Sequence, residues 1–164
     1  MDANTFRNLF EYHFTRNREL WQHCIATLTP DQFVQEIDYS IGSLRNQCVH
    51  LQNIDERWFS GLRGLDLPDF ADPAAYPDAA SVRAKWDAVE AGMREYLADL
   101  KDSALAEDFM PGVKVWQILF HVINHGTDHR AQMLASLHAL GAPTFAQDYF
   151  FFANDMPVKV TTTT

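Results

Sequence analysis

The sequence predicts an all-α fold, and its hydrophobic pattern and its length are the observations that predict it. Apolar residues recur at three- and four-residue steps in four long stretches, and no strand pattern extends beyond a few residues. The chain has 164 residues, 47% of them hydrophobic, which suits one ordinary domain with a substantial core. We therefore expect one helical domain over residues 1–158 and a C-terminal tail over residues 159–164.

The first two predicted helices occupy the N-terminal part of the chain. Apolar side chains at helical steps predict a helix over about residues 4–28. The Thr-Pro-Asp run at residues 29–31 breaks this pattern, and a polar connection follows. Apolar residues then recur at helical steps from Ile41, which predicts a second helix that ends near Gly61 or Gly64.

The third and fourth predicted helices follow a long proline-rich segment. Residues 65–80 contain three prolines and four aspartates, and they form a loop long enough to cross from one end of a bundle to the other. Ser81 is the expected N-cap of a third helix that ends around Asp102. After a second loop, the fourth helix is expected over about residues 114–140, and Gly141 ends it as the C′ residue.

The fourth predicted helix is apolar on two faces, and both faces need cover. One face carries His125 and His129 among aliphatic side chains. The opposite face consists of Trp116, Phe120, Ile123, Thr127, Leu134 and Leu137. We expect a homodimer through this second face, because a lone bundle of this size would leave it in water. The alternative is a monomer whose aromatic segment 145–152 folds back over the helix.

Composition excludes several classes of protein. The formal charge of −9 argues against a nucleic-acid partner, which would need a clustered basic surface. No apolar stretch approaches the roughly 20 residues that span a bilayer, and the first residues do not form a secretion signal. We expect a cytoplasmic protein with no membrane partner. Cys24 and Cys48 fall on apolar helical stripes, which is typical of buried thiols in a reducing compartment.

His125 and His129 are the most informative pair in the chain. Their four-residue spacing stacks two imidazoles on one helical face, as a shared metal ion requires, although histidines satisfied by hydrogen bonds are more common. The candidates for a third ligand are His50, Asp55, His13 and His121. His121 and His129 are about 12 Å apart along the helix axis and cannot share one ion. Periodicity places Asp55 in the apolar stripe and His50 on its flank, so the spacing leaves the third ligand open.

Two segments of the chain resemble one known family. The segment Val115–Gln132, VWQILFHVINHGTDHRAQ in one-letter code, followed by Leu140-Gly141, closely resembles the C-terminal signature of the DinB-like (YfiT-like) family of candidate metalloenzymes. Ser40–Leu44, His50 and Asp55–Trp58 resemble the second-helix motif of that family. The resemblance covers nearly the whole chain. Ala131 stands where a glycine is usual, and Asp128 stands where an aromatic or small residue is frequent.

The resemblance implies a four-helix bundle with long crossover connections, often dimeric, and a divalent metal bound by His50, His125 and His129. We expect zinc or nickel. Some members act on low-molecular-weight thiols, so the resemblance implies a thiol S-transferase, in which the ion activates a small thiol to attack an electrophile, or a hydrolase, in which it activates water. The alternative is a non-catalytic, metal-stabilised dimeric binding module of the stress response. No serine elbow, phosphate loop or dinucleotide fingerprint suggests another enzyme class.

Overall fold

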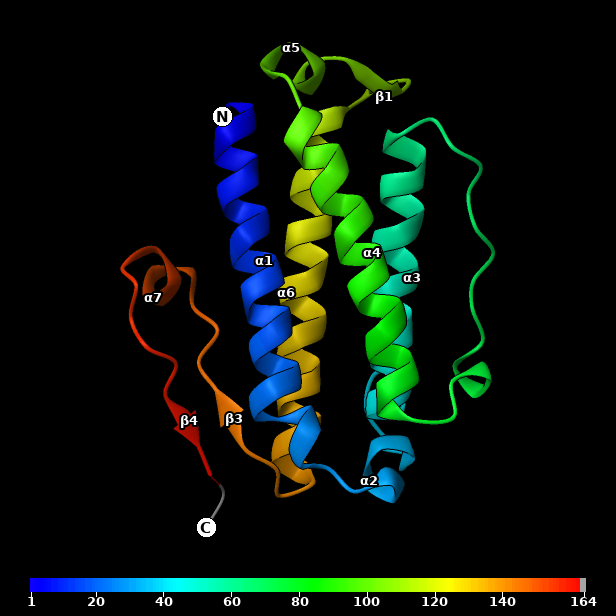
Figure 1. Cartoon of the computed structure of the whole chain (residues 1–164), viewed down its shortest axis with the longest axis vertical. Helices are drawn as coiled ribbons and strands as arrows, with labels where there is room; N and C mark the ends of the chain where they lie inside the picture. The colour runs from blue at the N-terminus through cyan, green and yellow to red at the C-terminus, as the bar shows by residue number, and fades with distance from the viewer. Residues whose placement is uncertain (163–164) are drawn as a thin grey trace.

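Four long helices form the body of the protein, whose computed structural model describes residues 1–162 (Figure 1). The helices are α1 (Ala3–His23), α3 (Leu44–Leu62), α4 (Ala79–Asp99) and α6 (Val115–Ala139). They lie side by side, and contacts join α1 to α4, α4 to α3, α3 to α6 and α6 to α1. The predicted all-α class is confirmed.

Short elements occupy the segments between and after the long helices. The helical ones are η1 (Ile25–Thr27), α2 (Pro30–Val34), η2 (Pro73–Ala75), α5 (Asp102–Leu105) and α7 (Tyr149–Ala153). The strands pair as two antiparallel ribbons, β1 (Asp108–Met110) with β2 (Val113–Lys114), and β3 (Thr144–Phe145) with β4 (Val160–Thr161). β4 therefore begins two residues after the expected end of the domain. Its pairing with β3 holds the described part of the expected tail against the protein.

Helix boundaries differ from the sequence expectation where side chains cap the backbone. α3 begins at Leu44 rather than near Ile41, because Ser40 and Gly42 adopt φ angles of 55° and 88°, which no helix contains. The N-cap of α4 is Asp78 rather than Ser81, because an Asp78 carboxylate oxygen accepts a hydrogen bond of 2.8 Å from the backbone N–H of Ser81. Both differences reflect local turn chemistry that hydrophobic periodicity does not report.

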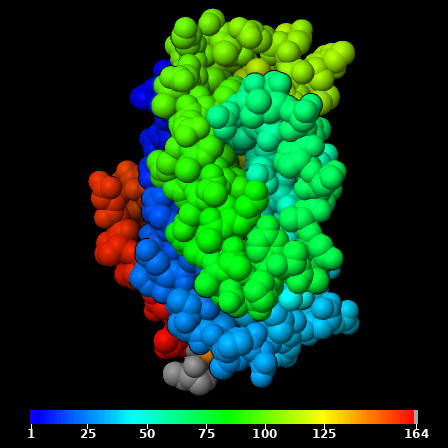
Figure 2. All heavy atoms as spheres, turned by 45° about the vertical axis from the view of Figure 1, so that its right-hand side comes forward, coloured from blue at the N-terminus to red at the C-terminus, as the bar shows by residue number. Residues whose placement is uncertain are grey.

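Residues 63–78 run the length of α3 on the outside of the molecule, as expected for a long crossover (Figure 1). Because this segment returns the chain to its starting end, α3 and α4 run parallel to each other, and α1 and α6 run in the opposite direction. The Asn53 side chain anchors the crossover to α3, since its amide donates to the carbonyl of Ala71 at 3.0 Å and accepts from its N–H at 3.2 Å. Figure 2 shows the face that the crossover and α4 cover together.

The core consists of two apolar clusters with a polar layer between them. One cluster includes Trp21, Leu44 and Leu137, and the other includes Phe6, Leu97 and Leu119. The buried polar residues between them are His13, Asn17, Asp55 and Arg130. The candidate functional site lies at this level of the bundle.

The C-terminal segment lies beside α1 (Figure 1). Tyr149 and Phe152 pack against the ring of Tyr12, whose hydroxyl donates a hydrogen bond of 2.7 Å to a backbone carbonyl of the same segment. The segment leaves Trp116 38% exposed and Phe120 48% exposed on α6. Part of the second apolar face thus stays in solvent, and the homodimer remains a prediction. In the described part of the chain, no helix has the length and apolarity needed to cross a membrane.

Candidate metal centre

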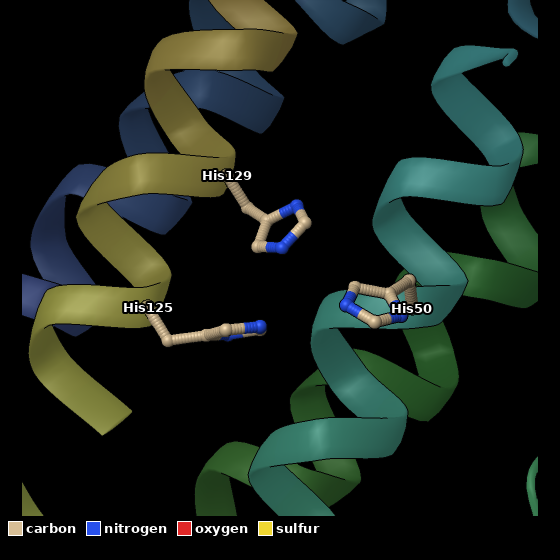
Figure 3. Close-up of side chains that lie close together, drawn as sticks. All are labelled: His50, His125 and His129. Atoms are coloured by element: carbon tan, nitrogen blue, oxygen red, sulfur yellow. The ribbon is translucent and has the colours of Figure 1, made fainter. Parts of the chain in front are cut away.

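Three imidazoles converge on one point between α3 and α6 (Figure 3). His50 comes from α3, and His125 and His129 come from successive turns of α6. Each offers one ring nitrogen, and these three atoms all lie within 4.8 Å of one another. The ring centroids of His125 and His129 are 4.3 Å apart, and that of His50 lies 4.6 Å from the centroid of His129.

The structure brings His50, and not Asp55, to the histidine pair. Periodicity made Asp55 a candidate because it indicates which residues face the centre of the core, where Asp55 lies with 1% exposure. The three histidines meet instead at the interface between α3 and α6, and it is the flank of α3 that faces this interface. His121 is exposed and lies outside the cluster, where it packs edge-to-face against Trp58 with the ring centroids 5.4 Å apart.

A hydrogen-bond chain orients His129. Its Nδ1 lies 3.0 Å from the Oε1 atom of Gln47. Because a carbonyl oxygen only accepts, Nδ1 carries the hydrogen and Nε2 keeps a free lone pair. The amide of Gln47 donates to Oε1 of Gln132 at 3.4 Å, and the amide of Gln132 donates to the carboxylate of Asp128 at 3.0 Å. Gln47 is a functional candidate that the sequence did not reveal, because no spacing within one helix pairs it with His129.

Burial keeps the three imidazoles neutral. It lowers the pKa of His125 to about 3, with a smaller effect from the neighbouring histidines. It also lowers the pKa of His50 and of His129. Nδ1 of His125 is buried and has no hydrogen-bond partner. Neutral rings with uncommitted nitrogens are the form that binds a metal ion.

A buried polar network lies on the next face of α6. Nη1 of Arg130 donates to Nδ1 of His13 at 3.1 Å, and Nε2 of the same ring lies 3.1 Å from the amide nitrogen of Asn17 and 3.4 Å from the carboxylate of Asp55. Arg130 also donates to Asn17 at 2.9 Å. Burial lowers the pKa of His13, so its contact with Asp55 is a hydrogen bond of a neutral ring rather than an ion pair.

Gly126 makes room for this network. A Cβ atom at Gly126 would lie 2.3 Å from Cε1 of His13, which is far inside van der Waals contact. The glycine between the histidines of α6 therefore lets the His13 ring approach the helix backbone. The sequence signal was a glycine inside a long helical pattern, which usually has a packing reason.

The donor set fits a divalent metal ion. Three neutral imidazoles on two rigid helices supply three of the four ligands that zinc takes, and no further His, Cys, Asp or Glu of residues 1–162 joins the cluster. Three protein ligands with one position left are typical of catalytic centres, whereas structural zinc sites use four. The arrangement can therefore bind an ion through three protein ligands and leave a fourth coordination position for a small ligand.

Comparisons with known proteins agree with this architecture. A family model described as the DinB family matches residues 1–157. A crystal structure of a conserved protein from Enterococcus faecalis is similar, with a TM-score of 0.59 and 17% sequence identity over 81% of this chain and 92% of that chain. At that identity the structural likeness concerns the fold alone. A search of curated proteins found no match.

Proposed function

Because this chain belongs to the DinB family, we propose that it is a metal-dependent enzyme in which His50, His125 and His129 bind a divalent ion, with zinc or nickel as the expected metal. The observation that carries the proposal is the set of three ring nitrogens within 4.8 Å of one another. The hydrogen bond from His129 to Gln47 supports it, because it fixes the ring with its free lone pair toward the cluster.

We propose that the reaction is a thiol S-transfer to an electrophilic small molecule, and that hydrolysis is the second candidate. A bound divalent ion lowers the pKa of a coordinated thiol or water and so supplies a nucleophile at neutral pH. Protein thiols do not suit this role, since burial raises the pKa of Cys24 to about 11 and raises that of Cys48 as well. The rings of His50 and His125 are half-buried, so the cluster is not sealed from solvent.

A non-catalytic, metal-stabilised dimeric binding module is the competing function. An ion between α3 and α6 would add a link between two helices that packing and the contact of His129 with Gln47 already join, and it would stabilise the fold without any reaction. The exposed rings of Trp116 and Phe120 support the proposed homodimer in either function. Sedimentation equilibrium of the wild type and of Phe120→Ser measures that interface, and a monomeric wild type would reject it.

The metal site is tested by elemental analysis of the full chain purified without a histidine tag. We expect close to one ion per chain in the wild type and a loss of most of it in His50→Ala and in His125→Ala. His121→Ala is the matched control, because this exposed histidine lies one turn from His125 outside the cluster and should keep its metal. Full metal content in His50→Ala would overturn the ligand assignment.

The reaction is tested with the metal-loaded protein, a panel of small thiols and a chromogenic aryl halide as the electrophile. Thiol-dependent product formation that His125→Ala abolishes supports the transferase. Hydrolysis of an activated ester or amide without thiol supports the hydrolase. No turnover in either assay, together with a melting temperature that falls strongly when the metal is removed, supports the binding module instead.

A further inference from the structure

A second cavity opens along α3, beyond the histidine cluster. It has a volume of about 510 Å³, which is within the usual range of small-molecule sites. Its walls come from α3, the crossover segment and β1, and they include Ile54, Trp58, Leu67, Phe70 and Phe109. Phe70 is 59% exposed. An apolar cavity with aromatic walls favours an apolar or aromatic ligand.

One positively charged side chain, Arg57, lies in this apolar wall. The Arg57 guanidinium lies 4.4 Å from the ring centre of Phe70, and one of its nitrogens donates to the backbone carbonyl of Pro68. Arg57 forms no salt bridge with any Asp or Glu of residues 1–162, in a chain whose formal charge is −9. Its remaining N–H groups are therefore available to a carboxylate, which guanidinium binds through paired hydrogen bonds.

The cavity and the histidine cluster share one face of α3. His50, Ile54, Trp58 and Gly61 follow one another at three- and four-residue steps, so their side chains lie in one row, and Ile54 is about 6 Å along the axis from His50. Trp58 packs edge-to-face against His121 with the ring centroids 5.4 Å apart, and the ring centroid of His121 lies 5.7 Å from that of His125. A ligand whose reactive end reaches the cluster would thus extend its other end toward the cavity.

We propose that this cavity binds the apolar part of an organic carboxylate, aryl or long-chain alkyl, whose acidic group pairs with Arg57. As the electrophilic substrate, this ligand places its reactive atom at the histidine cluster. The role as substrate depends on the proposed function, whereas binding in the cavity does not. Ile54 and Trp58, which line the cavity and follow His50 along α3, would contact the middle of the ligand.

Binding is tested with two fluorescent probes that differ in one charged group. 8-Anilinonaphthalene-1-sulfonate is an aromatic anion, and N-phenyl-1-naphthylamine has the same rings without the sulfonate. We expect both probes to bind the full-length protein. Arg57→Gln should lower the affinity for the anionic probe by about tenfold, because a hydrogen bond to a charged group is lost. It should change the affinity for the neutral probe by no more than about twofold. Equal effects on both probes would overturn the role of Arg57.

The position of the probes is tested by removing an aromatic wall. Phe70→Ser should lower the affinity for both probes by about tenfold, since the substitution exposes the bound rings to water. Phe150→Ser is the matched control, because Phe150 is 66% exposed on α7 and does not line the cavity. Equal binding in the two variants would overturn the proposal. So would a wild-type dimer that Phe70→Ser dissociates, because the cavity would then be a subunit interface.

The two proposals fail separately. Probe affinity should be unchanged in metal-free protein and in His125→Ala, because no histidine of the cluster lines the cavity. If metal analysis fails and the probes still follow the expected pattern, the proposed function is lost and the cavity remains a binding site. In the active, metal-loaded protein, the anionic probe should compete with an electrophile that bears a carboxylate. A rate that the bound probe does not change would overturn the role of the cavity in substrate binding.

Discussion

The imidazoles at two adjacent faces of α6, His13 of α1 at one face and the histidine cluster at the other, differ in how their ring nitrogens are used. His13, fully buried, has hydrogen-bond partners at both ring nitrogens, from Arg130 and Asp55. His125, which is half-buried, has no partner at Nδ1, and its neighbours within reach are two more imidazoles. Burial lowers the pKa of both rings. The difference shows that uncommitted nitrogens, rather than burial or a depressed pKa, distinguish a candidate metal ligand from a structural histidine.

The largest effect should come from removing the carboxylate of the buried network. Asp55→Asn leaves Arg130 buried without a nearby negative charge, and we expect a loss of about 3 kcal/mol in the free energy of unfolding. Urea denaturation measures this loss. The metal content of the folded fraction should not change, and a variant that folds but loses its ion would place Asp55 among the ligands.

The next effect tests how closely α1 and α6 must approach each other at Gly126. Gly126→Ala puts a methyl group into the His13 ring, and we expect it to destabilise the protein by about 1–3 kcal/mol. Gly92→Ala on α4 is the matched control. Its new Cβ would meet only the mobile end of Arg63, at 3.2 Å, and alanine favours the helix, so stability should be unchanged or rise by up to about 1 kcal/mol. Thermal unfolding of both variants gives the comparison.

A smaller effect should separate metal affinity from stability. Gln47→Ala removes the partner that orients His129, and we expect metal affinity to fall by about 10–100-fold while the chain still folds. Competition with a chromogenic chelator measures the affinity. Gln132→Ala should change it less, because this residue contacts Gln47 rather than a histidine of the cluster. The reverse order would reject the proposed hydrogen-bond chain.

The effect of acid is the smallest near neutral pH, and it grows as the pH falls. In the metal-free protein the pKa of His125 lies at about 3 when folded, below its ordinary value of 6.5, so between these values the unfolded chain binds more protons. Stability should therefore fall as the pH decreases from 6.5, and it should be nearly constant above pH 7. His125→Gln should show a shallower fall, part of which remains because His13 is also held neutral. Urea denaturation at several pH values gives the slope, and identical slopes would contradict the assignment.

Several parts of the fold were predictable because local chemistry decides them. The amphipathic pattern predicted all four long helices, and both ends of α6 lie within one residue of the prediction. The short elements α2, β1 and β2 were missed. α2 depends on a reciprocal cap between Thr29 and Gln32, and the β1–β2 ribbon depends on a turn at Gly112 with a φ angle of 79°.

The candidate site was likewise predictable only where its residues are related by spacing within one helix or by the family resemblance. The pair His125 and His129 follows from spacing within one helix, and the family resemblance indicated His50. The links from His129 to Gln47 and from His13 to Asp55 join helices that are far apart in the sequence. No periodicity within one helix reports such contacts, because they depend on the rotation and height of each helix relative to its neighbours.

The sequence by itself determined the helical class, the approximate positions of the main helices and the imidazole pair on α6, since each depends on residues within a few turns of one another. The tertiary structure brings His50 rather than Asp55 to that pair, as the family resemblance indicated and periodicity did not, and it alone placed Arg130 on His13 and an apolar cavity along α3 beyond His50. The physical reason is that the candidate site lies at the interface between two helices. The packing of whole helices, and not the pattern along either one, places side chains there.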